Sequence, residues 1–257
     1  MGMRPFVIGS VPYVNASPLV RWFETEPGKQ VAQVRVAPPS VLAGWLTRRE
    51  VDVALVSSVE WFHRPDTRFV PGLAIASEGA VLSVRLFSKV PIAAVRSVAL
   101  DTSSLTSSAL TQILLARVYG LRPQYGAHPP DLEAMLQSCD AGLLIGDKGM
   151  TAQLSDGFVL DLGQAWYDWT GLPFVWAMWL ANAEAPLEAL SEVLHTAYEW
   201  GAQNIERLIE LEAKHTSIPH ALVARYLTQV MVYRIDERFL QGLMRFREEW
   251  ARHSGVQ

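Results

Sequence analysis

Short apolar segments alternate with amphipathic ones along the first third of the chain, and this order constrains the fold more than any other feature. Residues 6–9, 31–37 and 51–56 are apolar runs typical of buried strands, whereas the segments from Pro18 and over 41–49 have the mixed faces of helices. Strands that are separated by helices usually pair in parallel. The pattern therefore predicts βαβ units and a parallel sheet.

A second module of the same plan follows the apolar segment 80–88. It comprises a strand over 98–100, a polar turn over 101–108, a helix over 109–119, a helix over 132–137 and a strand over 141–145. The chain is apolar again from Pro173 to Trp179 and mostly helical from Pro186, over 187–195, 202–211, 219–232 and 236–250. We expect an α/β protein of two lobes with a helical C-terminal region and a ligand cleft between the lobes. Residues 1–88 with 175–257 would form lobe 1, and the inserted residues 89–174 would form lobe 2.

Composition excludes several classes of function. Half of the 257 residues are hydrophobic and 19% are charged, so the chain can bury a sizeable core. A net charge of −4 with scattered Lys and Arg predicts no nucleic-acid partner. The single cysteine, Cys139, excludes an internal disulfide, and no motif of metal-ligand spacing occurs, so we expect neither metal nor cofactor. Without a secretory leader or a membrane-length apolar run, we expect a soluble, cytoplasmic protein with no membrane partner.

Polar turns follow four of the predicted strands. They are Ser10–Asn15, Ser57–Ser58, Ser103–Ser107 and Gly146–Asp147. Ligands of open α/β sheets lie at the carboxyl ends of strands, and helix N-termini offer N–H groups to anions. These turns are rich in neutral donors and suit a small anionic molecule, if they converge on one cleft. Turn geometry alone would also explain Gly9, Pro12 and Pro18, and helix capping by Ser104 or Thr106 would explain the third turn.

Hydrolytic chemistry has little support in the sequence. No serine lies in a G-x-S-x-G motif, and all six histidines lie outside the four turns. The acidic residues show no paired-carboxylate pattern of the kind that glycosidases use. These absences leave a binding site of hydroxyl, amide and backbone groups as the main functional signal.

Five segments together resemble the chorismate dehydratase family of the futalosine route to menaquinone. They are residues 10–19, 52–60, 83–91, 100–107 and 161–174, and the resemblance extends in order from about residue 6 to 180. It implies a type II periplasmic-binding-protein-like fold that serves as an enzyme, a carbon-oxygen lyase (hydro-lyase). The implied substrate is chorismate, a small dicarboxylate, which loses water to give 3-[(1-carboxyvinyl)oxy]benzoate.

The resemblance also implies roles for particular residues. Asn15 matches an asparagine tied to catalysis, and we expect it to orient the substrate or the departing hydroxyl. Because an amide is a poor base, the enolpyruvyl carboxylate of the substrate would take the proton. The expected substrate-binding residues are Ser10, Ser57, Ser58, Ser83, Ser104, Thr106, Ser107 and Asp147; of these, Ser57, Ser104, Thr106 and Ser107 would hold carboxylates.

Two alternatives remain open at this stage. One is a cyclic dehypoxanthine futalosine synthase-like enzyme later in the same route, which carries a histidine after the strand over 143–145, where this chain has Gly146-Asp147. The other is a non-catalytic solute-binding protein for a small carboxylate. A homodimer is possible, and exposed apolar surface on the C-terminal helices would favour it.

Overall fold

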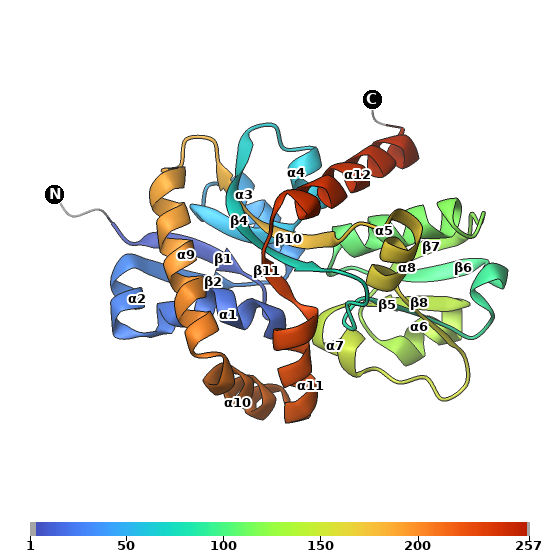
Figure 1. Cartoon of the computed structure of the whole chain (residues 1–257). Helices are drawn as coiled ribbons and strands as arrows, with labels where there is room; N and C mark the ends of the chain where they lie inside the picture. The colour runs from blue at the N-terminus through green and yellow to red at the C-terminus, as the bar shows by residue number, and fades with distance from the viewer. Residues whose placement is uncertain (1–3, 256–257) are drawn as a thin grey trace. The chain divides into compact units, whose positions relative to one another are not determined.

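The computed structural model describes residues 4–255, which fold into two compact units (Figure 1). Unit 1 contains the chain up to Ile75 and the segment Ala177–Arg234. Unit 2 contains Ala76–Trp176 and the chain from Ile235 onward. Each unit is built around its own β-sheet.

Unit 1 has a six-stranded sheet in the order β11-β4-β10-β3-β1-β2. The strands are β1 (Phe6–Ser10), β2 (Ala32–Val36), β3 (Val53–Ser57), β4 (Thr67–Ser77), β10 (Phe174–Asn182) and β11 (Val232–Arg234). β1 pairs in parallel with both β2 and β3, as the alternation of strands and helices predicted. All five residues of β3 are buried, which accounts for its uninterrupted apolar sequence.

The helical segments of unit 1 connect its strands. They are η1 (Val14–Ala16), α1 (Ser17–Val20), η2 (Arg21–Glu24), α2 (Glu26–Val31), α3 (Pro39–Thr47), α4 (Val59–Phe62), α9 (Leu187–Gln203), α10 (Ile205–Thr216), α11 (His220–Arg225) and the π-helical turn η4 (Tyr226–Val230). α1 packs against α9 and α10 (Figure 1), and a Cβ on Gly201 would lie 2.0 Å from the carbonyl oxygen of Pro18. Gly201 therefore permits the close approach of α9 to α1.

Unit 2 has a five-stranded sheet in the order β7-β6-β8-β5-β9. The strands are β5 (Arg85–Ser88), β6 (Ser97–Asp101), β7 (Gln124–His128), β8 (Ala141–Leu144) and β9 (Phe158–Asp161). β6 is parallel to β7 and β8, whereas β5 is antiparallel to β8 and β9. The second module is thus also built on parallel strands, and β5 alone runs antiparallel to its two neighbours in this sheet.

Six helical segments belong to unit 2. They are η3 (Ile92–Ala94), α5 (Leu105–Arg117), α6 (Leu132–Ser138), α7 (Gly146–Thr151), α8 (Leu162–Thr170) and α12 (Glu237–Ser254). α12 packs against α5, and α5 in turn packs against α8. None of the helices within residues 4–255 combines the length and the apolar character needed to cross a bilayer.

The boundaries of the two units differ from the expected ones at residues 76–88, at residues 175–176 and in the last helix. Residues 76–88 belong to unit 2, because β5 pairs with β8 and β9 in the second sheet. The last helix, α12, also belongs to unit 2, because it packs against α5 and its buried Glu249 forms an ion pair with Arg117 of α5. The chain therefore passes between the units three times, since it returns to unit 2 after Arg234.

Candidate functional site

The first two predicted turns lie side by side in unit 1. β1 ends at Ser10 and its parallel neighbour β3 ends at Ser57, so the turns that follow leave the same edge of the sheet. Ser10 and Ser58 are fully buried, and Ser57 is 4% exposed. Gly9 packs tightly here, because a Cβ would lie 3.0 Å from a methyl carbon of Leu42 and 3.2 Å from the Cβ of Ala54.

Asn15 lies in η1, directly after β1, and an interaction with a distant residue holds its side chain. The Nδ2 group donates a hydrogen bond of 3.0 Å to the hydroxyl of Tyr226, which is 211 residues away in sequence. The Oδ1 atom is buried and has no hydrogen-bond partner among residues 4–255. A buried carbonyl oxygen without a partner costs free energy, so this atom is a strong candidate for a ligand contact.

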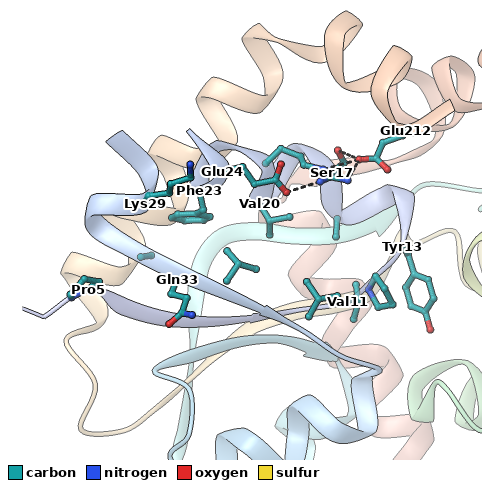
Figure 2. Close-up of a pocket in the computed structure, with 16 residues that line it drawn as sticks. Pro5, Val11, Tyr13, Ser17, Val20, Phe23, Glu24, Lys29, Gln33 and Glu212 are labelled. Atoms are coloured by element: carbon teal, nitrogen blue, oxygen red, sulfur yellow. Dashed lines mark hydrogen bonds and ion pairs between the residues drawn. The ribbon is translucent and has the colours of Figure 1, made fainter. Parts of the chain in front are cut away.

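Ser17, two residues beyond Asn15, anchors the same turn to α10. Its hydroxyl donates a 2.8 Å hydrogen bond to Glu212, which is 5% exposed and also accepts a 2.8 Å hydrogen bond from Arg21 Nε. Figure 2 shows Ser17 and Glu212 facing each other. Burial lowers the pKa of Arg21, but the carboxylates of Glu212 and Glu24 outweigh this, and the pKa of Arg21 is raised overall.

A cavity of about 750 Å³ lies beside this turn within unit 1 (Figure 2). Tyr13, Ala16 and Ser17 form part of its wall, and the edge strand β2 contributes Gln33 and Val34. Asn15 and the predicted serines at the strand ends are not among the residues that line it. The Asn15 amide and this cavity are therefore separate features of the same turn.

The third predicted turn begins α5 of unit 2, and Ser104 is the N-cap residue of that helix. Its hydroxyl accepts a 3.2 Å hydrogen bond from the Ser107 N–H and lies 3.1 Å from the Ser107 hydroxyl. Ser104, Thr106 and Ser107 are all buried. The capping interpretation of this turn is confirmed, and capping leaves other N–H groups of the first helical turn to meet an anion.

Asp101 joins the third predicted turn to the fourth. This residue is 2% exposed, and its carboxylate accepts hydrogen bonds from Ser103 N–H at 2.8 Å and from Ile145 N–H at 3.3 Å. Ile145 immediately precedes Gly146 and Asp147, which begin α7. The structure therefore brings Ser104, Thr106, Ser107 and Asp147 to one edge of the second sheet.

Ser83 follows a strained turn in unit 2. Leu82 has a φ of 63°, a conformation that residues other than glycine rarely adopt. The carboxylate of Asp161 holds this turn, because it accepts hydrogen bonds from Val81 N–H at 3.0 Å and Leu82 N–H at 2.8 Å. Strain of this kind is often found where a side chain must be placed for function. Ser83 is 2% exposed.

The arrangement is suited to binding a small polar molecule with neutral donors and acceptors. The candidate residues offer hydroxyl groups and helix N-termini in both units, and the amide of Asn15 in unit 1. Asp147 of unit 2 is the one acidic side chain among them. The part of the chain from Arg4 to Gly255 holds no group of three His, Cys, Asp or Glu side chains placed to bind a metal ion.

Four residues that hold the candidate turns were not assigned a role from the sequence. Asp161 has a local signal, because it N-caps α8 and precedes Gln164 by three residues, as in a capping box. Asp101 also has one, because an Asp two residues before a bonded N–H is a common turn motif. Tyr226 and Glu212 have no local sequence signal, since their hydrogen-bond partners are about 200 residues away.

Comparison with solved structures identifies the class of fold. A protein from Archaeoglobus fulgidus has a TM-score of 0.82 at 16% identity, and the match covers all of both chains. The periplasmic aliphatic sulphonate binding protein of Escherichia coli has a TM-score of 0.68 at 17% identity, covering 99% of this chain and 94% of that one. The chain therefore has a periplasmic-binding-protein-like fold, which confirms the expected fold class.

Sequence comparison identifies the family within that class. The chain belongs to the menaquinone biosynthesis family, whose model matches residues 6–252. The chorismate dehydratase of Thermus thermophilus is 32% identical, and the match covers 96% of this chain and 95% of the relative. The resemblance noted in the sequence is confirmed and extends through the helical C-terminal region.

Proposed function

We propose that this protein is a chorismate dehydratase of menaquinone biosynthesis. The observation that carries this proposal is the similarity along the whole chain to a relative of that name in Thermus thermophilus. The membership of the chain in the menaquinone biosynthesis family supports the same conclusion. Proteins with a periplasmic-binding-protein-like fold include solute-binding proteins. The proposed function makes this chain an enzyme instead, a hydro-lyase.

The reaction removes a ring hydroxyl and a neighbouring ring proton from chorismate as water. A C–H bond and a C–O bond of the ring break, an aromatic ring forms, and the product is 3-[(1-carboxyvinyl)oxy]benzoate. Because aromatisation makes the reaction strongly favourable, the protein needs to supply mainly orientation and hydrogen bonds to developing charge.

Asn15 is the proposed catalytic residue. Its amide orients the substrate or the departing hydroxyl, while the enolpyruvyl carboxylate of the substrate accepts the ring proton. The buried, unpartnered Oδ1 supports this role, since a hydrogen bond from the substrate would satisfy it. An amide is too weak a base to take the proton itself.

The proposed substrate contacts fall into two groups. Ser10, Ser57 and Ser58 come from unit 1, and Ser83, Ser104, Thr106, Ser107 and Asp147 come from unit 2. Ser57, Ser104, Thr106 and Ser107 would hold the two carboxylates of chorismate through hydroxyl and backbone donors.

An ultraviolet assay of the purified protein with chorismate tests the proposal. We expect the chorismate spectrum to be replaced by that of a substituted benzoate, and mass spectrometry should find a product lighter by one water. If chorismate binds without reacting, the protein is a solute-binding protein. If only cyclic dehypoxanthine futalosine is consumed, the chain is the later enzyme of the same route.

A further inference from the structure

The hydrogen bond between Asn15 and Tyr226 links the proposed catalytic residue to the C-terminal part of unit 1. Tyr226 is 1% exposed, and the segment that contains it contacts η1, the segment that contains Asn15. Asn15 itself is partly exposed, although its Oδ1 is covered. The Tyr226 hydroxyl therefore holds the Nδ2 group of this partly exposed residue.

Tyr226 begins an unusual segment of backbone. The N–H of Met231 bonds to the carbonyl oxygen of Tyr226 at 3.0 Å, five residues earlier, which defines the π-helical turn η4. π-Helical turns are rare and occur frequently at functional sites, because they re-aim one side chain within an otherwise α-helical run. η4 continues α11, which packs against α10, and α10 supplies Glu212 to the same turn.

We propose that Tyr226 is a positioning residue that fixes the orientation of the Asn15 amide for the dehydration reaction. This inference rests on the proposed function of Asn15. A primary amide carries two N–H groups and one carbonyl oxygen, and the bond to Tyr226 uses one N–H. Because that N–H is held, the orientation of the whole planar amide is fixed. Oδ1 and the second N–H then point toward the substrate.

Tyr233 provides a matched control within the same unit. It is also buried, at 6% exposure, but its hydroxyl has no hydrogen-bond partner among residues 4–255. Burial raises the pKa of Tyr233 well above its ordinary value, so the hydroxyl stays protonated and neutral. Removing either hydroxyl leaves a buried phenyl ring, and only one of the two removals frees the Asn15 amide.

The experiment compares Y226F with Y233F by steady-state kinetics on chorismate and by thermal unfolding. We expect Y226F to lower kcat by about 10- to 100-fold, the effect of a misoriented catalytic group. KM should stay within about threefold, because the carboxylate contacts are unchanged. Y233F should leave both constants within about threefold of their values in the unaltered protein.

If Y226F does not fold, Tyr226→His, which keeps a hydrogen-bond acceptor, is used instead and should retain more activity than Tyr226→Ala.

A double-mutant cycle with Asn15→Ala separates positioning from general support of the fold. If Tyr226 acts through Asn15, Y226F should not lower kcat further once the amide is absent. An equal loss in both backgrounds overturns the inference, and so does a Y226F enzyme that behaves like Y233F. Neither outcome affects the proposed function, which fails instead if the unaltered protein does not convert chorismate.

Discussion

The two units hold their candidate ligand turns in opposite ways. In unit 1 the turn with Asn15 and Ser17 is held by Tyr226 and Glu212, which lie 211 and 195 residues away in sequence. In unit 2 the turn at Ser104 is held by its own neighbours, through bonds that span two or three residues. One turn depends on tertiary structure, whereas the other depends mainly on local sequence.

This difference separates the proposed roles of the two turns. A helix N-terminus that binds a carboxylate needs only free N–H groups, and a capping serine arranges them locally. A catalytic amide must be held within a narrow range of angles, and this requires packing and hydrogen bonds from several directions. The C-terminal helices α10 and α11, with η4, provide this support in unit 1. The predictions below test the contrast.

Asn15→Ala should have the largest effect on activity. We expect kcat to fall by about 10²- to 10³-fold, because the variant loses a preorganised hydrogen-bonding group. Stability should change little, since the amide makes one side-chain hydrogen bond and leaves Oδ1 unsatisfied. Kinetics with chorismate and thermal unfolding measure the two effects.

Asn204→Ala is the control for this variant. Asn204 is an asparagine of the same unit whose Nδ2 donates a 2.8 Å hydrogen bond to the Trp200 carbonyl oxygen. Asn15→Asp is also informative, because a carboxylate would repel the dicarboxylate substrate and should be nearly as damaging. Full turnover by folded Asn15→Ala or Asn15→Asp would remove Asn15 from the mechanism.

Glu212→Gln should loosen the turn of unit 1 from a distance. The substitution keeps the shape of the side chain but removes the charge that holds Arg21 and the Ser17 hydroxyl. We expect a loss of about 2 kcal/mol in the free energy of unfolding, the range for charge-assisted hydrogen bonds. Urea denaturation measures it.

Glu210→Gln, at an exposed position of the same helix, should leave stability within about 0.5 kcal/mol. The long-range support of unit 1 also predicts a lower kcat for Glu212→Gln than for Glu210→Gln. Equal stability of the two variants would show that the Ser17–Glu212 contact is dispensable.

Ser104→Ala should have a smaller effect, because it removes one local cap. We expect about 1 kcal/mol of destabilisation, together with a higher KM for chorismate if α5 holds a carboxylate. Ser108→Ala is the control, since the Ser108 hydroxyl only bonds back to the Ser104 carbonyl oxygen inside the helix. Thermal unfolding and kinetics of the pair test whether capping and binding share this turn.

The same contrast explains what the sequence could predict. Alternating apolar segments predicted β1, β2, β3, β6 and β8, because each is a short, mainly apolar run next to a helix, although only Ala32 of the edge strand β2 is buried. The Ser104 cap was predictable because its partner lies three residues ahead. η4 and the first residue of β11 lie within a segment that helical spacing predicted as one helix over 219–232, and the π-helical turn ends that helix early. The position of α12 in unit 2 had no local signal either, since its contacts with α5, among them the ion pair between Glu249 and Arg117, join segments that are far apart in sequence.

The far end of α5 shows that unit 2 also uses long-range contacts, away from its candidate turn. Glu249 of α12 is 2% exposed and pairs with Arg117 at 3.1 Å and with Arg252 at 2.8 Å. Arg117, Arg122, Arg252 and His253 line a cavity of about 370 Å³ beside these contacts. Burial lowers the pKa of His253, and the charges of Arg117 and Arg122 lower it further.

The pKa of His253 is therefore a probe of whether α12 packs on the end of α5. Arg122→Ala should raise the pKa of His253 towards its ordinary value of 6.5, because one repelling charge is lost. Arg207→Ala, which removes a charge other than the two that lower the pKa of His253, should leave that pKa unchanged.

The lowered pKa also makes stability depend on pH. A group whose pKa is lowered by folding binds fewer protons in the folded state, so the free energy of unfolding falls as the pH drops through 6.5. This loss should be smaller in Arg122→Ala. NMR titration of the His253 ring gives the pKa directly, and an unshifted value in the unaltered protein would place α12 away from α5.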